Sequence, residues 1–409
     1  MKNSKIAKNT IALYAMNIAK MILPLITLPY LTRVLTKDCY GTISYVKAVM
    51  QYMQLFVDFG FLLSGTKNIV KTINDKEKLE KETGDILFAK IILSGLAFMV
   101  LLILVAFIPI LRVNISLTLL SFVTVFLTCF LFDYFFRGTE EMQVIAKRFV
   151  LMKLISSALT FVFVKNDSDV LWIPILDILG SIFAIVLVVC ELKKRNIRIR
   201  ISNIKNIVFK IKESFVYFVS DMATTAFNAL NTVLIGLFLT EGQVADWSIC
   251  MQMVSAVQSM YSPIINSIYP EMVKNKNIKL IKKVLKIFMP MIIIGCIFTF
   301  LVAEPALVLI GGKQYITATL VLRTLIPLLF ISFPAMLFGW PALGAISKEK
   351  QVTKTTICAA LVQIIGLILL AILNQFTLLN IAILRCVSEF LLFFLRFFYC
   401  RKYKLEFTN

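Results

Sequence analysis

The chain has 409 residues, of which 59% are hydrophobic and 16% are charged, and its net charge is +20. A soluble protein cannot bury that much apolar surface, because a folded chain of this size leaves a large part of its surface in contact with water. The composition therefore predicts an integral membrane protein and excludes a soluble enzyme, a secreted disulfide-bonded scaffold and a DNA-binding protein. Because the sequence contains no His, it also offers neither a Ser-His-Asp triad nor the usual metal sites.

Apolar runs of about 20 residues, the length that crosses a bilayer, recur along the whole chain. They predict an all-α integral membrane protein with twelve transmembrane helices. The predicted spans are residues 10–32, 40–65, 84–108, 115–136, 146–164, 170–190, 213–239, 246–270, 285–310, 319–343, 353–373 and 378–400. An even number of spans places both termini on the same side of the membrane.

Basic residues are distributed unevenly between the two sides of this topology. Most of the 43 Lys and Arg lie at the termini or in loops on the same side as the termini. The opposite loops contain only Arg33, Lys37, Arg112, Lys165 and Lys313. By the positive-inside rule, both termini face the cytoplasm. The basic loop 191–212 is interpreted as a solvated linker near anionic headgroups, in preference to a nucleic-acid-binding or lipid-specific segment.

The longest cytoplasmic loop lies near the middle of the chain, which suggests an internal repeat. At an offset of 204 residues, Thr36 aligns with Thr240 and Gln54 with Gln258. Six spans separate equivalent positions, so the two halves have the same orientation and are related by an axis along the membrane normal. We therefore predict two pseudo-symmetric six-helix bundles, residues 1–200 and residues 201–409, around a central hydrated cavity.

The first two predicted helices of each half carry polar side chains along one face, at the three- and four-residue spacing of a helix. These stripes consist of Thr10, Tyr14, Asn17, Lys20, Pro24 and Thr27; Ser44, Lys47, Gln51, Gln54 and Asp58; Tyr217, Asp221, Thr224, Asn228 and Asn231; and Ser248, Gln252, Ser255, Ser259, Ser262, Asn266 and Tyr269. Polar side chains also join helices inside membranes. Amides and charges along most of the membrane depth exceed what packing requires, so we interpret the stripes as the lining of the hydrated cavity.

Several cationic side chains lie within the predicted spans, where an ionisable group costs about 2.5–3.5 kcal/mol and has a functional role or a partner. Lys20 is too far from either end of its helix to reach the headgroups, and Lys47 lies on a polar stripe. For both we favour contact with an anionic cargo over structural pairing. Lys47 lies in the outward third of its helix, and Arg323 and Arg385 lie at a similar or shallower depth from the outer side in the second half of the chain. Lys90, nearer the end of its span, is expected to extend to the headgroups.

The acidic residues and one proline of the spans suggest further roles. Asp58 and Asp221 lie on the polar stripes, where a carboxylate could bind a proton or Na⁺ for coupling. Glu389 follows Arg385 by four residues, so an ion pair within one helix is the favoured interpretation there. Pro24 interrupts the first predicted helix, and a bend at this position would suit either a gate or a structural kink.

The first two predicted helices and the residues that follow them carry sequence motifs that are similar to those of a known family. These residues are the stretch Leu28-Pro29-Tyr30-Leu31-Thr32-Arg33-Val34-Leu35, Gly41, Asp58-Phe59-Gly60-Phe61 and Ser64-Gly65-Thr66-Lys67. With its twelve spans and four polar helices, the chain resembles the polysaccharide repeat-unit (O-antigen, capsule and exopolysaccharide, Wzx-type) flippases of the multidrug/oligolipid/polysaccharide exporter superfamily. Members of this group often carry Arg where this chain has Lys67.

The resemblance implies a flippase, not an enzyme, that moves an undecaprenyl-pyrophosphate-linked oligosaccharide from the cytoplasmic to the outer leaflet of a bacterial plasma membrane by alternating access. The implied cargo contacts are Lys20, Lys47, Arg323 and Arg385 for pyrophosphate or acidic sugars, and Asn17, Gln51, Gln54, Asn228 and Gln252 for sugar hydroxyls. Coupling would use H⁺ or Na⁺ at Asp58 or Asp221, with Pro24 and Arg33 in gating and no cofactor or metal. Expected partners are membrane lipids, a polysaccharide polymerase and a chain-length regulator, but not nucleic acid.

Other classes of protein stay open. A cation-coupled multidrug exporter of the same superfamily should have an acidic cavity, whereas this chain offers Lys20 and Lys47. A lipid II flippase is closer, although members of that group usually carry two additional C-terminal helices. A membrane-embedded polysaccharide polymerase or glycosyltransferase needs a large external loop for its chemistry, and every predicted outward loop is short.

Overall fold

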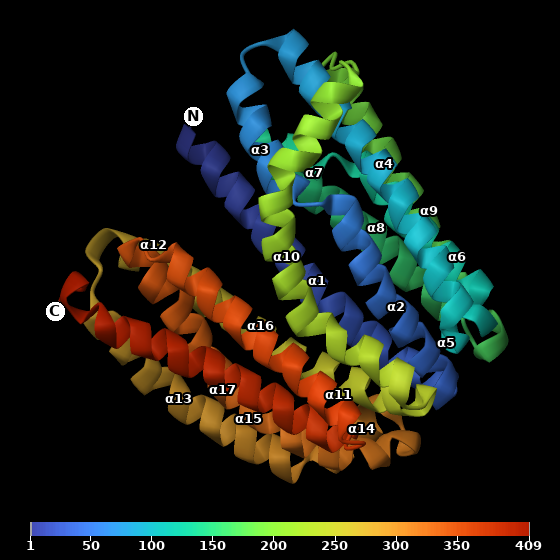
Figure 1. Cartoon of the computed structure of the whole chain (residues 1–409), viewed down its shortest axis with the longest axis vertical. Coiled ribbons are helices and arrows are strands. Elements are labelled where there is room, and N and C mark those ends of the chain that lie inside the picture. Colours follow the sequence, from blue (N-terminus) through green and yellow to red (C-terminus); the bar gives the residue numbers. More distant parts are fainter. Residues whose placement is uncertain (1, 409) are drawn as a thin grey trace. The chain divides into compact units, whose positions relative to one another are not determined.

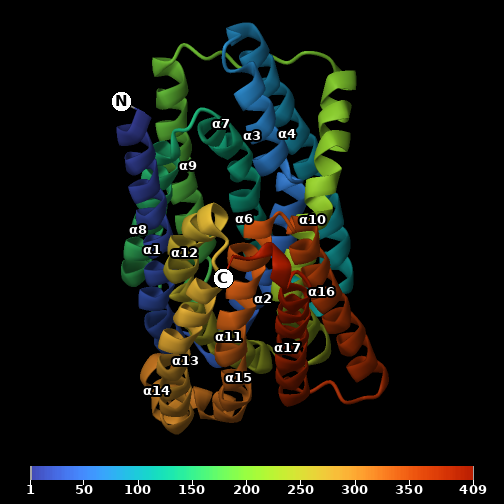
Figure 2. The same cartoon turned by 90° about the vertical axis from the view of Figure 1, so that its left-hand side faces the viewer.

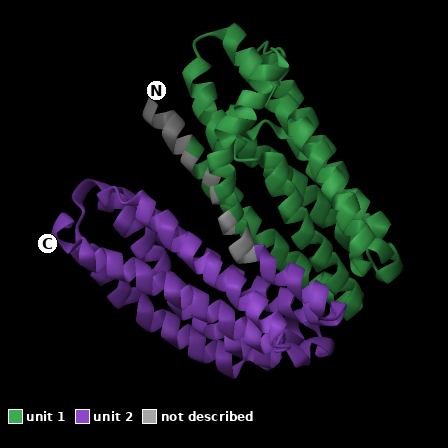
Figure 3. Cartoon of the chain, in the orientation of Figure 1, with its two compact units in different colours: residues 1–225 green, residues 226–409 purple. Residues whose placement is uncertain are grey.

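The computed structural model describes the backbone of residues 2–408 and the side chains of these residues except at positions 2–8, 10, 13, 220, 223, 224 and 226–228. The described chain is almost entirely helical, and its one extended pairing is an isolated bridge between Asn277 and Thr408 (Figure 1). The helices form two compact units, residues 1–225 and residues 226–409 (Figure 3). The boundary between the units lies within α10 (Ile204–Phe238), whereas the division at residue 200 suggested by the sequence falls in the linker before this helix.

Unit 1 contains the first six predicted spans, two of which are interrupted. Its elements are α1 (Lys2–Val34), α2 (Lys37–Asp58), α3 (Phe61–Thr72), α4 (Lys76–Phe107), α5 (Pro109–Val113), α6 (Ile115–Leu127), η1 (Thr128–Leu131), α7 (Asp133–Gly138), α8 (Met142–Phe163), η2 (Asp167–Asp169), α9 (Trp172–Lys194) and the first part of α10. α1 packs against α8, α8 against α9, α9 against α6, α6 against α2 and α2 against α4. The broken spans are α2–α3 and α6–η1–α7.

Unit 2 is a second bundle built around α15. Its elements after α10 are α11 (Glu241–Ser259), α12 (Tyr261–Asn275), α13 (Ile278–Leu301), α14 (Ala303–Gly311), η3 (Lys313–Ala318), α15 (Thr319–Leu337), η4 (Phe338–Leu343), η5 (Gly344–Ile346), α16 (Glu349–Ile372), α17 (Leu378–Lys402) and η6 (Lys404–Glu406). α15 packs against α11, α13 and α17, and α17 packs against α16. The buried side chains of Tyr261, Phe333 and Phe338 lie in the core of this unit.

The internal repeat predicted from the sequence is visible in the boundaries of the helices. α1 ends at Val34 and α10 at Phe238, which is 204 residues later. α2 and α11 both follow a threonine N-cap, Thr36 and Thr240, again 204 residues apart. Each threonine hydroxyl accepts a hydrogen bond from a backbone N–H of the first turn, which stabilises the start of the helix. The same capping chemistry therefore begins the second span of both units.

Nine helical segments of the described chain are long and apolar enough to cross a membrane. The other three expected spans correspond to α8, α10 and the α11–α12 pair, which carry more charged or amide side chains, so the number twelve stays a prediction. Large apolar side chains are exposed along helices such as α13, for example Met291, Ile294 and Phe298. Exposed apolar helix faces of this kind are suited to contact with lipid. The predicted all-α membrane fold is thus confirmed.

The linker between α9 and α10 is bound along the start of α4, and Figure 2 shows it passing the ends of α3 and α4. Glu80 accepts hydrogen bonds from the Arg198 N–H (3.0 Å) and the Arg200 guanidinium (3.0 Å). Asp85 accepts from both the N–H (2.8 Å) and the hydroxyl (2.6 Å) of Ser202. We refer to these contacts of Glu80 and Asp85 as the linker clasp. The linker is therefore an ordered part of unit 1 rather than a fully solvated segment, because acidic side chains of α4 bind its backbone.

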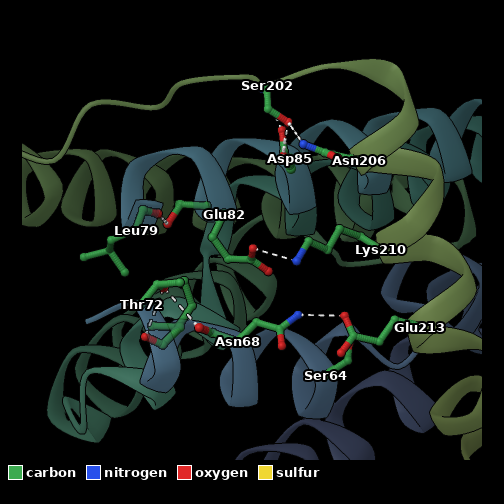
Figure 4. Close-up of polar contacts among 12 residues, drawn as sticks. Ser64, Asn68, Thr72, Leu79, Glu82, Asp85, Ser202, Asn206, Lys210 and Glu213 are labelled. Carbon is green, nitrogen blue, oxygen red and sulfur yellow. Dashed lines mark hydrogen bonds and ion pairs between the residues drawn. The ribbon is translucent and has the colours of Figure 1, made fainter. Parts of the chain in front are cut away.

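The first part of α10 continues this contact with a row of polar pairs to α3 and α4 (Figure 4). The pairs are Lys210 with Glu82 (2.7 Å), Glu213 with Asn68 (2.9 Å) and Ser214 with Ser64 (2.6 Å). Their α10 members share one face of the helix. The Lys210–Glu82 pair lines a pocket of about 330 Å³, whose lining also includes Thr72, Lys78 and Asn206. Asp75 caps the start of α4 by accepting from the Lys78 N–H (3.1 Å), which lowers the pKa of Asp75.

Gly84 lies in α4 where the linker crosses this helix. A Cβ added to Gly84 would lie 2.0 Å from the backbone oxygen of Arg200. We expect Gly84→Ala to displace the linker and to lower the thermal unfolding temperature of the purified protein, at a cost of about 1–3 kcal/mol. Gly95→Ala in the same helix is the matched control, because nothing lies within 4 Å of its added Cβ. Equal unfolding temperatures for the two variants would contradict this close packing.

Candidate functional site

The helix that carries Asp58 is broken immediately after this residue. α2 ends at Asp58, Phe59 (φ 40°) and Gly60 (φ 75°) have left-handed backbone conformations, and α3 begins at Phe61. Glycine is required at position 60, since a Cβ there would lie 2.6 Å from the Cβ of Tyr217 on α10. Interrupted helices occur within membranes where the backbone is buried in protein or lines a water-filled space. The break therefore marks a candidate site.

Asp58 is the centre of a polar network that joins α2, α4 and η1. It accepts hydrogen bonds from Lys90 Nζ (2.9 Å) and from Gln54 Nε2 (2.7 Å), and Gln54 Nε2 also donates to Thr128 Oγ1 (3.0 Å). The Lys90 side chain is only 8% exposed, whereas that of Asp58 is 43% exposed. The expectation that Lys90 extends to the headgroups is therefore wrong, because the carboxylate of Asp58 holds the ammonium inside. A buried charge without such a partner would be strongly destabilising.

A second break lies between α6 and α8. η1 is followed by Phe132 in a left-handed conformation (φ 51°), and α7 begins at Asp133. The Asp133 carboxylate forms an ion pair with Arg148 on α8. The Arg148 side chain is 4% exposed and that of Asp133 is 40% exposed. Lys90 also interacts electrostatically with Asp133, so the two breaks belong to one ionic network.

Lys20 on α1 belongs to the same network. Its Nζ atom lies 5.1 Å from the centroid of the Phe149 ring, a cation–π contact. It also interacts electrostatically with Asp133, Arg137 and Arg148. We refer to Lys20, Asp133, Arg137 and Arg148 as the basic cluster. With three cations and one carboxylate, the cluster has an excess of positive charge that suits an anionic ligand.

Lys47 belongs to a separate group of charges in unit 1. It is exposed on α2 and interacts electrostatically with Asp177 and Lys153. Asp177 on α9 accepts hydrogen bonds from Lys153 Nζ (3.0 Å) and Ser156 Oγ (2.7 Å), both on α8. One carboxylate thus faces two ammonium groups, and this group also has an excess of positive charge.

The other predicted polar residues of unit 1 have different surroundings. Asn17 and Gln51 are exposed on α1 and α2. Asp221 on α10 is half-buried and interacts electrostatically with Asp58. The structure thus brings the two predicted coupling residues together. Asn228 lies outside the described side chains.

The predicted gating residues lie on an uninterrupted helix. α1 passes through Pro24 without a break, although a proline has no N–H and so leaves the Lys20 carbonyl without its helical hydrogen bond. Thr27 Oγ1 donates to the Pro24 carbonyl (3.2 Å). Arg33 is exposed near the end of α1. A gating role for these residues stays a prediction.

In unit 2 the predicted charges lie on α15 and α17. Arg385 and Glu389 form an ion pair at 2.9 Å with side chains that are 5% and 7% exposed, so the predicted pair within one helix is confirmed. Arg323 Nε donates to the Phe300 carbonyl (3.2 Å), and the guanidinium lies 5.2 Å from the centroid of the Phe300 ring. Gln252 is half-buried on α11. Contacts of these residues with cargo stay predictions.

Two buried arginines were missed by the sequence analysis, Arg148 and Arg396. Arg396 on α17 donates to the Ala335 carbonyl (2.8 Å) beside Gly339, where α15 passes into η4. It lies eleven residues after Arg385 on the same face of the helix, and this spacing was a usable signal. Arg148 offered no comparable signal, because it lies at the start of a predicted span, where an arginine normally faces the headgroups.

Comparison with known proteins identifies the family. Residues 6–276, about two thirds of the chain, match the family described as polysaccharide biosynthesis protein. The chain belongs to this family. Membership confirms the resemblance found around Asp58 and, with the apolar helices, shows a multi-pass integral membrane protein.

Two relatives match the chain over nearly their whole length. One, from Escherichia coli strain K12, is 26% identical over 412 residues and covers 97% of each chain. The other, from Shigella dysenteriae, is 25% identical over 367 residues and covers 88% of this chain and 91% of its own. Both carry the name "Putative O-antigen transporter". The relatives are thus named as transporters, in agreement with the expectation that the protein is not an enzyme.

Solved structures show the same fold at low sequence identity. A multidrug resistance MATE family transporter of the MOP superfamily, in an inward-facing conformation, has a TM-score of 0.66 and 16% identity and covers 94% of this chain and 98% of its own. The lipid II flippase MurJ, in an inward closed conformation, has a TM-score of 0.69 and 14% identity and covers 96% of this chain and 87% of its own. The chain therefore has the same fold as these solved structures.

The ion pair of Asp58 and Lys90 predicts an asymmetric response to mutation. Asp58→Asn leaves Lys90 buried without a carboxylate, whereas Lys90→Met leaves a half-exposed carboxylate that still accepts from Gln54. We expect Asp58→Asn to lower the thermal unfolding temperature more, and the double variant to recover part of the loss, with a coupling energy of about 0.5–3 kcal/mol. Strictly additive effects would mean that the pair contributes nothing to stability.

Proposed function

We propose that the protein is a flippase that moves undecaprenyl-pyrophosphate-linked oligosaccharide repeat units from the cytoplasmic to the outer leaflet, for the synthesis of a surface polysaccharide. One observation carries the proposal: a chain of the polysaccharide biosynthesis protein family places a cluster with excess positive charge, Lys20, Arg137 and Arg148 around Asp133, at a break in its membrane helices. In transporters, discontinuous helices commonly form the substrate site. Cations at such a site favour an anionic cargo.

The chemistry of the cargo suits the exposed polar residues of the polar stripes. Lys20 and Lys47 would contact pyrophosphate or acidic sugars, and the exposed amides of Asn17 and Gln51 would hydrogen-bond sugar hydroxyls. Gln54 already uses its amide group on Asp58 and Thr128, so its role would include holding these groups in place. The proposed contributions of unit 2 come from Asn228, Gln252, Arg323 and Arg385.

A two-bundle transporter that moves such a cargo would work by alternating access. Asp58 and Asp221 are the proposed sites of the coupling cation, H⁺ or Na⁺, because they interact electrostatically within unit 1. Two like charges repel, and a bound cation relieves the repulsion. Lys90 would compete with this cation for Asp58, since it already forms an ion pair there. Pro24 and Arg33 are the proposed gating residues on α1.

The distribution of Lys and Arg supports a location in the bacterial plasma membrane with both termini in the cytoplasm. In this orientation the basic loops face the leaflet on which the lipid-linked cargo is assembled. Once flipped, the repeat unit would pass to a polysaccharide polymerase and a chain-length regulator, which are the proposed partners beside the membrane lipids.

Deletion of the gene in its host tests the proposed function directly. We expect surface polysaccharide to be lost while complete lipid-linked repeat units accumulate on the cytoplasmic side, as measured by the orientation of these units in isolated membranes. Units that reach the outer face but stay unpolymerised would instead indicate a polymerase. Unchanged surface polysaccharide would favour a small-molecule exporter.

Complementation of the same strain tests the cargo contacts. Lys20→Ala and Lys47→Ala should lower export about tenfold or more without loss of protein, because each removes a charge-assisted contact. Lys165→Ala is the control, since this exposed lysine lies outside both charged groups. Export at the wild-type level by either variant would remove that lysine from the proposed site.

Transport in vesicles with an imposed ion gradient tests the coupling. We expect Asp58→Asn and Asp221→Asn to abolish the acceleration by a proton or Na⁺ gradient, because neither amide can exchange a proton or bring a charge to the site. Asp85→Asn, in the linker clasp, should keep this response. Gradient-driven transport by both site variants would exclude these carboxylates from coupling.

A further inference from the structure

The basic cluster has donors that its own carboxylate does not satisfy. Asp133 is the one anion among the four residues, and Arg148 is its direct partner. The buried Nε atoms of Arg137 and Arg148 have no hydrogen-bond partner among the described residues. A buried polar group without a partner costs about 1–3 kcal/mol. The cluster is therefore incomplete as a purely structural ion pair and has capacity for a further acceptor.

The exposure of the residues shows from which side an acceptor would come. Asp133 is 40% exposed and covers Arg148, which is 4% exposed. Lys20 is exposed on the neighbouring α1. Because Asp133 is the exposed member of its pair and interacts electrostatically with Lys20, we expect an anion near Lys20 to compete with this carboxylate for the Arg148 guanidinium.

We propose that the basic cluster binds a phosphate or pyrophosphate group and that Asp133 is a resident counter-ion which this group displaces from Arg148. A guanidinium presents a planar fork of N–H groups that matches two phosphate oxygens, and an ammonium adds a point charge. Two arginines and one lysine thus suit a multiply charged phosphoanion better than the single carboxylate they now hold. For the cargo described above, the group would be the pyrophosphate of the lipid-linked oligosaccharide, so in that form the inference rests on the proposed function.

The surroundings of Asp133 allow this exchange. Asp133 begins the short α7, which lies between left-handed residues at Phe132 (φ 51°) and Glu140 (φ 58°), whereas Arg148 is held in the long helix α8. The backbone of α7 is held by the buried Phe135 and Phe136, but the Asp133 side chain is 40% exposed, so its carboxylate can rotate away from Arg148. Because Lys90 interacts electrostatically with Asp133, the released carboxylate keeps a cationic neighbour.

The experiment compares ligand affinity in full-length protein and its variants in phosphatidylcholine nanodiscs, by isothermal titration calorimetry. The probes are farnesyl pyrophosphate, farnesol and inorganic pyrophosphate. We expect the wild-type protein to prefer farnesyl pyrophosphate to farnesol, Asp133→Asn to bind it about tenfold more tightly and Arg148→Gln about tenfold more weakly. Glu141→Gln is the matched control, because Glu141 also pairs with an arginine, Arg195, but lies beyond the end of α7 and outside the basic cluster.

The direction of the Asp133→Asn effect decides between ligand exchange and structural pairing. Unchanged or weaker binding by a variant with a normal unfolding temperature would overturn the proposal, as would equal affinity of the wild-type protein for farnesyl pyrophosphate and farnesol. If Asp133→Asn does not fold, Arg148→Lys decides, since it keeps the charge but loses the fork. Weaker binding by this variant supports the proposal, and unchanged binding overturns it.

The same titrations identify the source of the anion and separate this inference from the proposed function. Inorganic pyrophosphate that binds as tightly as farnesyl pyrophosphate indicates a site for free phosphoanions, whereas binding of the farnesyl form alone indicates a lipid-linked one; both support the site. A deletion strain with normal surface polysaccharide would overturn the proposed function and leave these titrations unaffected. Normal flipping with unchanged binding by Asp133→Asn would overturn this inference alone.

Discussion

A cation buried inside a membrane protein needs an anion within reach, because lipid offers no water to solvate it. In unit 1, Lys90 and Arg148 are almost fully buried, and each meets a carboxylate that is partly exposed. Both carboxylates lie where a helix breaks, Asp58 at the end of α2 and Asp133 at the start of α7. Continuous helices would have placed these acids differently, so the irregular backbone and the buried charges depend on each other.

Helix periodicity was readable from the sequence because it depends on neighbours in the chain. Arg385 and Glu389 are one turn apart, so a local rule found their ion pair. Thr36 and Thr240 were aligned by the internal repeat, and the structure adds that both are N-caps. The Asp58–Lys90 pair joins residues 32 positions apart on different helices. Periodicity shows which face of a helix is polar, but it does not show which other helix that face meets. For the same reason Asp133 and Arg148 were not recognised as partners.

The two units share helix boundaries and N-caps, but their buried cations have different kinds of partner. Unit 1 pairs buried cations with acids from other helices, whereas Arg385 in unit 2 pairs within α17 and Arg396 binds the carbonyl of Ala335. The repeat thus preserves helix boundaries and N-caps more closely than charges.

The linker clasp has a consequence for the biosynthesis of the protein. Its acidic residues are on α4 and its partners lie around Ser202, so every contact of the clasp is formed from residues that precede α11 in the chain. Domains generally fold in order of synthesis. The nascent chain can therefore close unit 1, with the start of α10 bound to α3 and α4, before the later helices leave the ribosome. The start of α10 would then already be held by unit 1 when the helices of unit 2 are inserted into the membrane.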